Sequence, residues 1–208
     1  MGLTPGPLRI GVFGGAFDPP HNAHVALAQT AVEQLGLDEL RIFPTGQAWH
    51  KPRTLSATEH RLAMAHLAFD GLQRVQVDER EMRRSGPTYT IDTLLELQQE
   101  YPGAQLFLML GQDQAQALPN WHRWQEILQL AIICVAVRDA DTQCAGEFEP
   151  FCGLPEVPQG RFQRLGLAPM AVGSTRIRAM LATGEGIAPL VPQAVARYIS
   201  LQHLYQNP

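Results

Sequence analysis

The chain has 208 residues, 45% of them hydrophobic, and a formal net charge of −4 at pH 7. This length and composition favour one globular domain with appended elements and a sizeable core. The negative charge argues against a general binder of nucleic acid or of membrane surfaces, because both classes of protein need a basic field.

Short apolar runs alternate along the chain with stretches that have helical spacing. Strands are predicted over residues 8–13, 40–43, 75–77, 106–110 and 131–137. Helices are predicted over residues 23–35, 59–69 and 121–130, and another begins at 91–97 and ends before Pro102. Strands that are apolar on both faces and are joined by helices indicate a parallel sheet covered by helices. The predicted fold class is therefore α/β, a Rossmann-like three-layer fold with a mainly parallel sheet flanked by helices.

The remainder of the chain is predicted to form a long loop and then a helical element. Residues 139–169 are rich in Gly, Pro and scattered charge, and only 161–167 has a strand-like pattern. A loop or small excursion fits this composition better than a second domain. A short strand ending at Val172, a helix over 174–182 and a final helix over 191–203 follow. We therefore expect a single domain over residues 1–208, with C-terminal helices within 172–205.

Several features carry no chemical signal of their own. The three cysteines lack C-x-x-C spacing, and Cys134 lies in an apolar strand, so packing is expected rather than a disulfide or zinc site. The charged run 78–84 is expected to be a solvated strand end and loop. No signal peptide and no run of about 18 apolar residues is visible, which favours a cytoplasmic protein without a membrane partner.

The first strand runs into a turn with the composition of a phosphate site. Residues 14–24 read GGAFDPPHNAH. The glycines let a ligand approach the backbone closely, and the prolines stop the strand and can start a helix. His21 and His24 would share one face of that helix near its positive end. Imidazoles beside exposed N–H groups favour an anionic ligand.

Two common nucleotide sites do not match this turn. Residues 11–15 read GVFGG, which is not G-x-G-x-x-G, and residues 42–46 supply no acid for a ribose diol. The lysine-bearing P-loop pattern is also missing from the turn. A redox Rossmann enzyme and a P-loop nucleotidase are therefore both disfavoured.

A second motif lies near the C-terminus, where residues 172–178 read VGSTRIR. Ser174 or Thr175 can cap a helix start, which leaves hydroxyl and N–H groups for a phosphate. Arg178 lies four residues after Ser174 on the same helix face, and its planar fork suits phosphate oxygens. Arg176 points elsewhere by this spacing and is expected at the surface.

These residues resemble a known family. Residues 14–24 are similar to the GG-x-FDP-x-H-x-GH signature of the HxGH nucleotidyltransferases, and residues 172–178 to their ISST-x-IR signature. Within that superfamily the chain resembles the bacterial nicotinate-nucleotide adenylyltransferases. The further matches are His50-Lys51 and residues 87–94, 111–113, 118–124 and 190–199. The matches run from Leu8 to Tyr205 in the family's order.

The resemblance implies a single nucleotidyltransferase domain that transfers the adenylyl group of ATP to nicotinate mononucleotide in NAD biosynthesis. The phosphate of the mononucleotide would attack the α-phosphorus of ATP in line, giving nicotinate adenine dinucleotide and pyrophosphate without a covalent enzyme intermediate. Catalysis would then rest on alignment and charge stabilisation. Mg²⁺ is the implied cofactor, held mainly through the ATP phosphates, so no metal site built from protein ligands is expected.

The resemblance also assigns roles to residues. The catalytic residues would be His21, His24 and Arg178. ATP would be bound by Gly14, Gly15, His21, His24, Gly111, Asp113, Ser174, Thr175 and Arg178. Nicotinate mononucleotide would be bound by Ala16, Phe17, Asp18, Thr45, Lys51, Thr90, Trp121 and His122. In this scheme Trp121 stacks on the pyridine ring and Lys51 contacts the acceptor phosphate.

Three residues depart from the family pattern: Ala16 where Thr is common, Ala23 where Gly is usual, and Gly173 in place of the first Ser of the distal motif. Two alternatives therefore stay open. One is an adenylyltransferase for an acceptor of phosphopantetheine or flavin type, and the other is a non-catalytic nucleotide-binding sensor. The sequence also leaves open nicotinate against nicotinamide preference and the oligomeric state, including a homo-oligomer.

Overall fold

The computed structural model describes residues 6–46, 55–138, 161–168 and 170–206. The strands are β1 (Arg9–Gly15), β2 (Glu39–Pro44), β3 (Val75–Val77), β4 (Gln105–Gly111), β5 (Ala131–Arg138) and β6 (Phe162–Leu167). The helices are α1 (Asn22–Gln34), α2 (Thr58–Phe69), α3 (Arg80–Arg83), α4 (Thr90–Glu100), α5 (Gln112–Ala117), α6 (Trp124–Leu130), α7 (Ser174–Ala182) and α8 (Gln193–Leu201). A 3-10 turn, η1 (Leu118–Asn120), separates α5 from α6.

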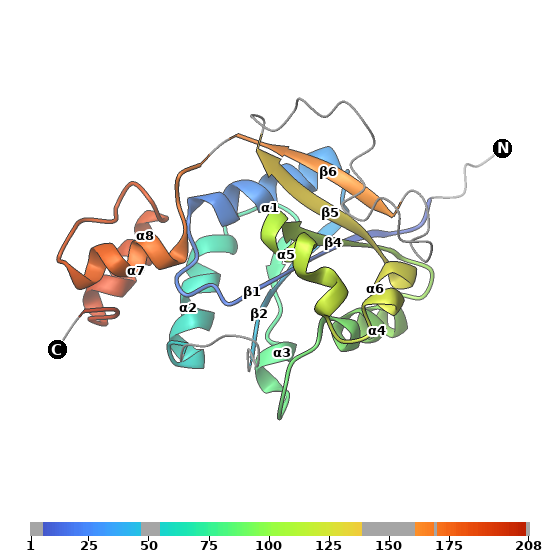
Figure 1. Ribbon diagram of the computed structural model, residues 1–208, viewed down its shortest axis with the longest axis horizontal. Helices are drawn as coiled ribbons and strands as arrows, with labels where there is room; N and C mark the ends of the chain where they lie inside the picture. Colours follow the sequence, from blue (N-terminus) through green and yellow to red (C-terminus); the bar gives the residue numbers. More distant parts are fainter. Residues whose placement is uncertain (1–5, 47–54, 139–160, 169, 207–208) are drawn as a thin grey trace. The chain divides into compact units, whose positions relative to one another are not determined.

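The strands form a six-stranded sheet in the order β3-β2-β1-β4-β5-β6 (Figure 1). β4 pairs in parallel with β1 and with β5, and β5 pairs in parallel with β6. Gln105 lies opposite Arg9 at the start of the β1–β4 pair. A mainly parallel sheet with flanking helices confirms the predicted Rossmann-like α/β fold.

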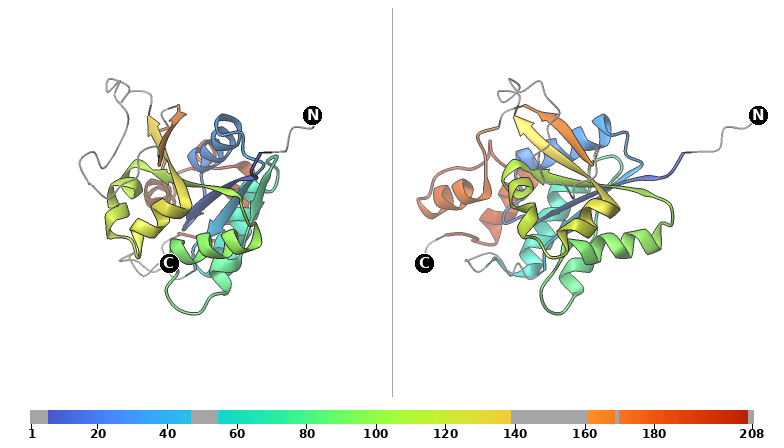
Figure 2. Two further views of the ribbon diagram at one scale, coloured as in Figure 1. Left: turned by 90° about the vertical axis from the view of Figure 1, so that its right-hand side faces the viewer. Right: turned by 45° about the vertical axis from the view of Figure 1, so that its right-hand side comes forward.

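The chain packs as two compact units. The first unit comprises Met1–Phe13, Thr30–Arg41 and Tyr89–Ala168, and the second comprises Gly14–Gln29, Ile42–Thr88 and Pro169–Pro208. Within the first unit α4 packs against α6 (Figure 2), and within the second α2 packs against α8 (Figure 1). The single nucleotidyltransferase domain over residues 1–208 stays a prediction.

Buried apolar side chains hold each unit together. In the first unit they come mainly from β4, β5 and α4, and include Phe107, Leu108, Ile133, Ile91 and Leu94. In the second unit they include Phe17, Phe43, Met64, Phe69, Ile177, Val195 and Ile199. Cys134 is fully buried as predicted, and burial raises the pKa of its thiol to about 12.

Most predicted elements are present, with different ends. β3 and α7 have the predicted bounds, and β1 runs two residues further than predicted, to Gly15. The predicted strand ending at Val172 is wrong, because residues 170–173 have no regular structure. The predicted helix over 121–130 begins only at Trp124, since Arg123 adopts the left-handed region with φ 54°. Residues 139–160 of the predicted loop lie outside the described residues.

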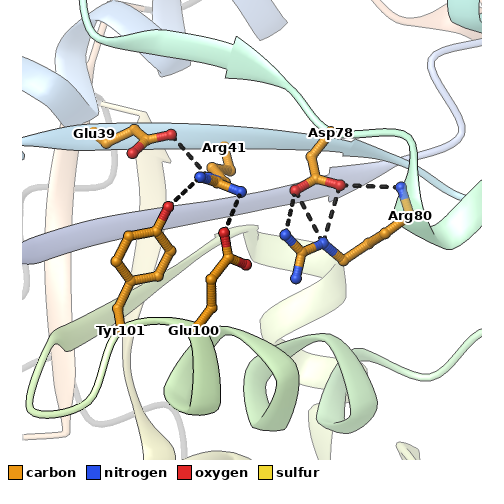
Figure 3. Close-up of polar contacts among 6 residues, drawn as sticks. All are labelled: Glu39, Arg41, Asp78, Arg80, Glu100 and Tyr101. Atoms are coloured by element: carbon orange, nitrogen blue, oxygen red, sulfur yellow. Dashed lines mark hydrogen bonds and ion pairs between the residues drawn. The ribbon is translucent and has the colours of Figure 1, made fainter.

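The charged run 78–84 is more ordered than predicted. It contains the short helix α3, and the Glu81 side chain is buried. Asp78 accepts hydrogen bonds from the backbone N–H of Arg80 at 3.0 Å and from its guanidinium at 2.9 Å (Figure 3). Pairing within the run compensates these charges locally, which favours an ordered segment over a solvated loop.

A second charged group, in the first unit, ties β2 to the end of α4. The Arg41 guanidinium lies 2.8 Å from Glu39, 3.3 Å from Glu100, and donates to the Tyr101 hydroxyl (Figure 3). Its plane also covers the Tyr101 ring. Across the described parts of the chain, no helix is long and apolar enough to cross a membrane.

Candidate active site

The turn after β1 lies in the second unit and begins with an open backbone. A Cβ placed on Gly14 would find no atom closer than the Phe43 carbonyl oxygen at 4.0 Å. Phe17 has a positive φ of 47°, and its buried ring packs edge-on against Phe69 and His24. The following Asp18–Pro19 peptide bond is cis. The turn therefore exposes backbone at Gly14 while Phe17 anchors it in the core.

His21 and His24 lie together at the start of α1, as their spacing predicts. The His21 carbonyl accepts the N–H groups of His24 and Val25, so His21 is the residue that starts the helix. The two imidazole rings stack with centroids 3.6 Å apart and planes 15° from parallel. The backbone N–H of His21 donates to the imidazole Nδ1 of His24 at 3.2 Å. When His24 is neutral, its proton therefore lies on Nε2, which makes that atom a donor.

The His21 side chain is 7% exposed, and its Nδ1 is buried without a hydrogen-bond partner in the described chain. Burial lowers the pKa of His21 to about 4, with a smaller opposing effect from its backbone hydrogen bond. His21 is therefore neutral at pH 7. A buried polar atom without a partner costs about 1–3 kcal/mol, which a hydrogen bond to a ligand would offset.

The distal motif packs directly onto this turn, also within the second unit. α7 begins after Gly173, and no side chain caps its first N–H groups, so the predicted cap by Ser174 or Thr175 is wrong. The Ser174 hydroxyl donates instead to the Pro19 carbonyl at 2.9 Å. Gly173, which has no side chain, occupies the cap position, and Ser174 and Thr175 are already the first two residues of the helix. Arg176 is exposed, as predicted.

Arg178 joins the distal motif to the residue before the cis bond. Its Nη1 donates to the Asp18 carbonyl oxygen at 2.7 Å, and its Nη2 donates to Thr175 Oγ1 at 3.1 Å. These contacts fix a guanidinium beside the turn that carries both histidines. The structure thus brings together the second-unit residues of the predicted ATP site, which are Gly14, Gly15, His21, His24, Ser174, Thr175 and Arg178.

Asp18 is the most buried polar residue of the turn, with a side chain that is 1% exposed. Its Oδ2 accepts the Ser56 N–H at 3.2 Å, and its Oδ1 accepts the Tyr205 hydroxyl at 2.6 Å. Burial, followed by the contact with Asp18, raises the pKa of Tyr205. The Asp18 carboxylate therefore organises the protein around it, and the predicted contact with the mononucleotide stays a prediction.

Sequence reasoning missed Arg61, which is 2% exposed on α2. Its guanidinium donates to the backbone carbonyl oxygens of Ser56 at 3.0 Å, Ala16 at 3.2 Å, Thr45 at 2.6 Å and Gly46 at 3.3 Å. It therefore holds the turn after β1 against the end of β2, where Thr45 also donates its N–H to Gly15. The sequence offers no clear signal for this role, because α2 also contains the polar residues Glu59, His60 and His66.

Gly46, at the end of β2, is enclosed on the side where a side chain would be. A Cβ there would lie 2.3 Å from the Glu81 carbonyl oxygen and 3.0 Å from Thr88 Oγ1. That hydroxyl is buried without a partner among the residues the structure describes. The end of β2 therefore requires glycine for a close approach of backbone, unlike Gly14.

Five further predicted site residues lie in the first unit: Thr90, Gly111, Asp113, Trp121 and His122. Thr90 begins α4, and Gly111 and the exposed Asp113 stand at the start of α5. Trp121 is half-buried after η1, and the neighbouring His122 ring lies 4.4 Å from the Tyr89 ring. The ring contact places the segment before Thr90 beside the segment that carries Trp121. Lys51 lies outside the described residues.

The donors gathered in the second unit suit an anion better than a metal ion. In residues 6–46, 55–138, 161–168 and 170–206, no group of three or more His, Cys, Asp or Glu side chains could hold a metal. Imidazole, guanidinium, hydroxyl and backbone N–H groups instead donate hydrogen bonds to phosphate oxygens. What the arrangement can do chemically is bind and polarise a phosphate chain.

Comparison with known proteins agrees with this chemistry. A family model described as cytidylyltransferase-like matches residues 12–180. The chain is 57% identical over 199 residues to a probable nicotinate-nucleotide adenylyltransferase of Albidiferax ferrireducens, covering 96% of this chain and 98% of that protein. It is 46% identical over 204 residues to a protein of the same description from Methylibium petroleiphilum, covering 96% and 93%.

Solved structures share the fold. The Plasmodium falciparum nicotinic acid mononucleotide adenylyltransferase, complexed with NaAD, aligns with a TM-score of 0.74, 17% identity, and coverage of 95% of this chain and 97% of that chain. The same protein complexed with APC aligns equally well, with a TM-score of 0.74. At this identity the likeness concerns the fold alone.

Proposed function

The chain belongs to the cytidylyltransferase-like family, among the nicotinate-nucleotide adenylyltransferases, and from this membership we propose that it transfers the adenylyl group of ATP to nicotinate mononucleotide. The products are nicotinate adenine dinucleotide and pyrophosphate, as required for NAD biosynthesis. The family model continues through both compact units, which supports a single nucleotidyltransferase domain.

One observation carries the proposal beyond family membership. Stacked imidazoles of His21 and His24 share a turn with a guanidinium, Arg178, that is bonded to the backbone of the same turn. The open backbone at Gly14 lies at the start of this turn. Together they supply hydrogen-bond donors, one fixed positive charge and space for a phosphate chain.

The reaction requires alignment and charge stabilisation rather than an enzyme nucleophile. An oxygen of the acceptor phosphate forms a bond to the α-phosphorus of ATP while the bond from that phosphorus to the β-phosphate oxygen breaks, and the electron pair leaves with pyrophosphate. Nε2 of His24 donates a hydrogen bond to the phosphate chain, and Arg178 balances the negative charge that builds on the leaving group. Donors that are already held in place act without reorganising during the reaction.

Mg²⁺ enters this scheme with the nucleotide. The Asp18 carboxylate already accepts from Ser56 and Tyr205, and the donors around it favour phosphate oxygens, so the residues present fit a cation held through the phosphates. Bound there, it would neutralise charge on the phosphate oxygens.

The contacts with the acceptor are proposed residue by residue from the family membership. Trp121 would stack on the pyridine ring, and Thr90 with the backbone near His122 would bind its carboxylate. Ala16, Phe17, Asp18, Thr45 and Lys51 are the proposed neighbours of the rest of the mononucleotide, and Gly111 and Asp113 those of ATP. The half-buried Trp121 and the Tyr89–His122 ring contact support this assignment.

The test is an acceptor comparison. The protein is incubated with ATP and Mg²⁺ plus nicotinate mononucleotide, nicotinamide mononucleotide, phosphopantetheine or FMN, and pyrophosphate release and dinucleotide mass are measured. We expect release with nicotinate mononucleotide to exceed release with each other acceptor. Preferred transfer to phosphopantetheine or FMN would assign the protein to another acceptor class. ATP binding by calorimetry, without pyrophosphate release on any acceptor, would identify a nucleotide sensor instead.

A further inference from the structure

The chain after α8 turns back on itself in an unusual backbone conformation. The Leu204 N–H bonds to the Ile199 carbonyl at 3.1 Å, and His203 and Tyr205 both have positive φ, at 52° and 63°. The Leu204 and His203 N–H bonds are those of an ordinary helix end, which accounts for the left-handed His203 but not for Tyr205. The Tyr205 side chain contacts residues far from it in the sequence.

Those contacts lead to the phosphate-binding turn. The Tyr205 hydroxyl donates to Asp18 Oδ1 at 2.6 Å and lies 4.0 Å from Met64 Sδ. A hydrogen bond from a hydroxyl to a carboxylate is shorter and stronger than one between neutral groups. Because the Asp18 carboxylate is almost fully buried, its orientation is set by the few groups that donate to it.

Asp18 passes this orientation on to the predicted catalytic groups. Its own carbonyl accepts Arg178, and the carbonyl of the next residue, Pro19, accepts the Ser174 hydroxyl. His21 follows two residues after Pro19. A rotation or shift of Asp18 would therefore move the acceptor that holds the Arg178 guanidinium and the start of the helix that carries the two histidines.

We propose that Tyr205 is a positioning residue for adenylyl transfer, which holds Arg178 and the histidine turn in place through its hydrogen bond to the Asp18 carboxylate. The proposal rests on the proposed function for its kinetic consequences. Tyr205 acts on the substrates only through Asp18, so its loss should lower the rate and phosphate binding without altering which acceptor is used.

The test compares two tyrosines that each lose one hydroxyl. Tyr205→Phe removes the bond to Asp18. The matched control Tyr198→Phe removes a hydroxyl in the same unit that contacts His60 Nδ1 at 2.9 Å and none of the turn residues. We expect Tyr205→Phe to lower kcat by about 10-fold, as for a group that misplaces charge stabilisation, with an unchanged order of preference among the acceptors. Tyr198→Phe should keep the wild-type kcat at a similar loss of Tm.

A purely structural role predicts a different result. In that case both variants have a lower Tm than the wild type and both keep the wild-type kcat. This result would overturn the proposal. If Tyr205→Phe does not fold, Tyr205→Met takes its place, because a methionine keeps an apolar side chain beside Met64 without the hydroxyl. A Tyr205→Met protein that folds and retains full kcat would contradict the proposal equally.

A double-mutant cycle tests whether Tyr205 affects the rate through Arg178. If Tyr205 acts by holding Arg178, the losses in kcat from Tyr205→Phe and Arg178→Lys should combine to less than their product, since both affect one group. Losses that multiply would show that Tyr205 does not act through the arginine.

Calorimetric titration with ATP separates failure of the proposal from failure of the proposed function. A wild-type protein that binds ATP without releasing pyrophosphate contradicts the proposed function alone. The inference is then decided by binding, where Tyr205→Phe should weaken ATP affinity severalfold and Tyr198→Phe should not. Equal affinities of the two variants, or no ATP binding by the wild type, would overturn the inference.

Discussion

Substitution of Gly14 by alanine separates the fold from the ligand site. Gly14 is exposed at the end of β1, its φ is not in the left-handed region, and a Cβ there has 4.0 Å to its nearest neighbour, the Phe43 carbonyl oxygen. The methyl group therefore causes no clash. Replacing glycine at a compatible position restricts the unfolded chain and stabilises a protein by roughly 0.4–1 kcal/mol. We expect the free energy of unfolding of Gly14→Ala to equal or exceed that of the wild type.

The same methyl group should impair catalysis, because it occupies the side from which a phosphate would approach the backbone. A misplacement on the order of 1 Å costs about 10²-fold in rate, which corresponds to about 2.7 kcal/mol. Pyrophosphate release under varied ATP gives kcat/KM, and urea unfolding gives stability. We expect kcat/KM for ATP to fall about 100-fold while stability is retained.

Gly46→Ala is the matched control. It adds the same methyl group, but it is expected to lower the free energy of unfolding. Its Cβ would lie 2.3 Å from the Glu81 carbonyl oxygen, which is backbone and cannot move aside as a flexible side chain can. Overpacking of this kind costs about 1–3 kcal/mol. A Gly14→Ala protein with wild-type kcat/KM would refute the reasoning that the ligand closely approaches this glycine.

Three further predictions concern buried or reactive groups. His24→Ala should lower kcat by roughly 10²–10³-fold, as for removal of one preorganised donor, with an unchanged circular dichroism spectrum, and near-normal turnover would contradict its role. Because His21 has a folded pKa of about 4 against an unfolded value of 6.5, the unfolded state binds more protons between these values. Stability should therefore fall as pH drops from 6.5 to 4, by up to about 3 kcal/mol more than in His21→Asn, as measured by urea unfolding. Alkylation of Cys134, followed by peptide mass at pH 8, should be much slower in the native protein than in urea, because the thiol is buried and its pKa is raised to about 12.

The elements of the sheet were predictable because local patterns determine them. β3 and α7 appear with their predicted bounds, since apolar residues with a period of 2 or 3.6 mark the face that must be buried. The His21–His24 contact was predictable for the same reason, as residues three apart on a helix are neighbours. The start of the 121–130 helix was not predictable, because nothing in an arginine side chain signals the left-handed conformation that Arg123 adopts.

The groups that hold the site together were not predictable from local patterns. Arg61 bonds to four backbone carbonyls, and a carbonyl group is the same at every residue type, so no residue pair marks the contact. Tyr205 reaches Asp18 across 187 positions of sequence. Ser174 has the local pattern of a helix cap, yet it donates to Pro19, 155 positions away. Long-range contacts of this kind override the local preference that a sequence displays.

The two halves of the phosphate site differ in how they carry charge. Burial keeps His21 neutral at pH 7 in the ligand-free protein, so the group that it offers to a phosphate is a hydrogen-bond donor rather than a full charge. An arginine side chain stays charged at any pH near neutrality, and Arg178 is a charged residue whose contact with the Asp18 carbonyl fixes it beside the turn. The position of the Arg178 guanidinium depends on the backbone carbonyl of Asp18. The side-chain carboxylate of the same residue accepts a hydrogen bond from Tyr205. The positive charge of Arg178 on α7 is therefore placed by Asp18 and Tyr205, which lie near opposite ends of the sequence.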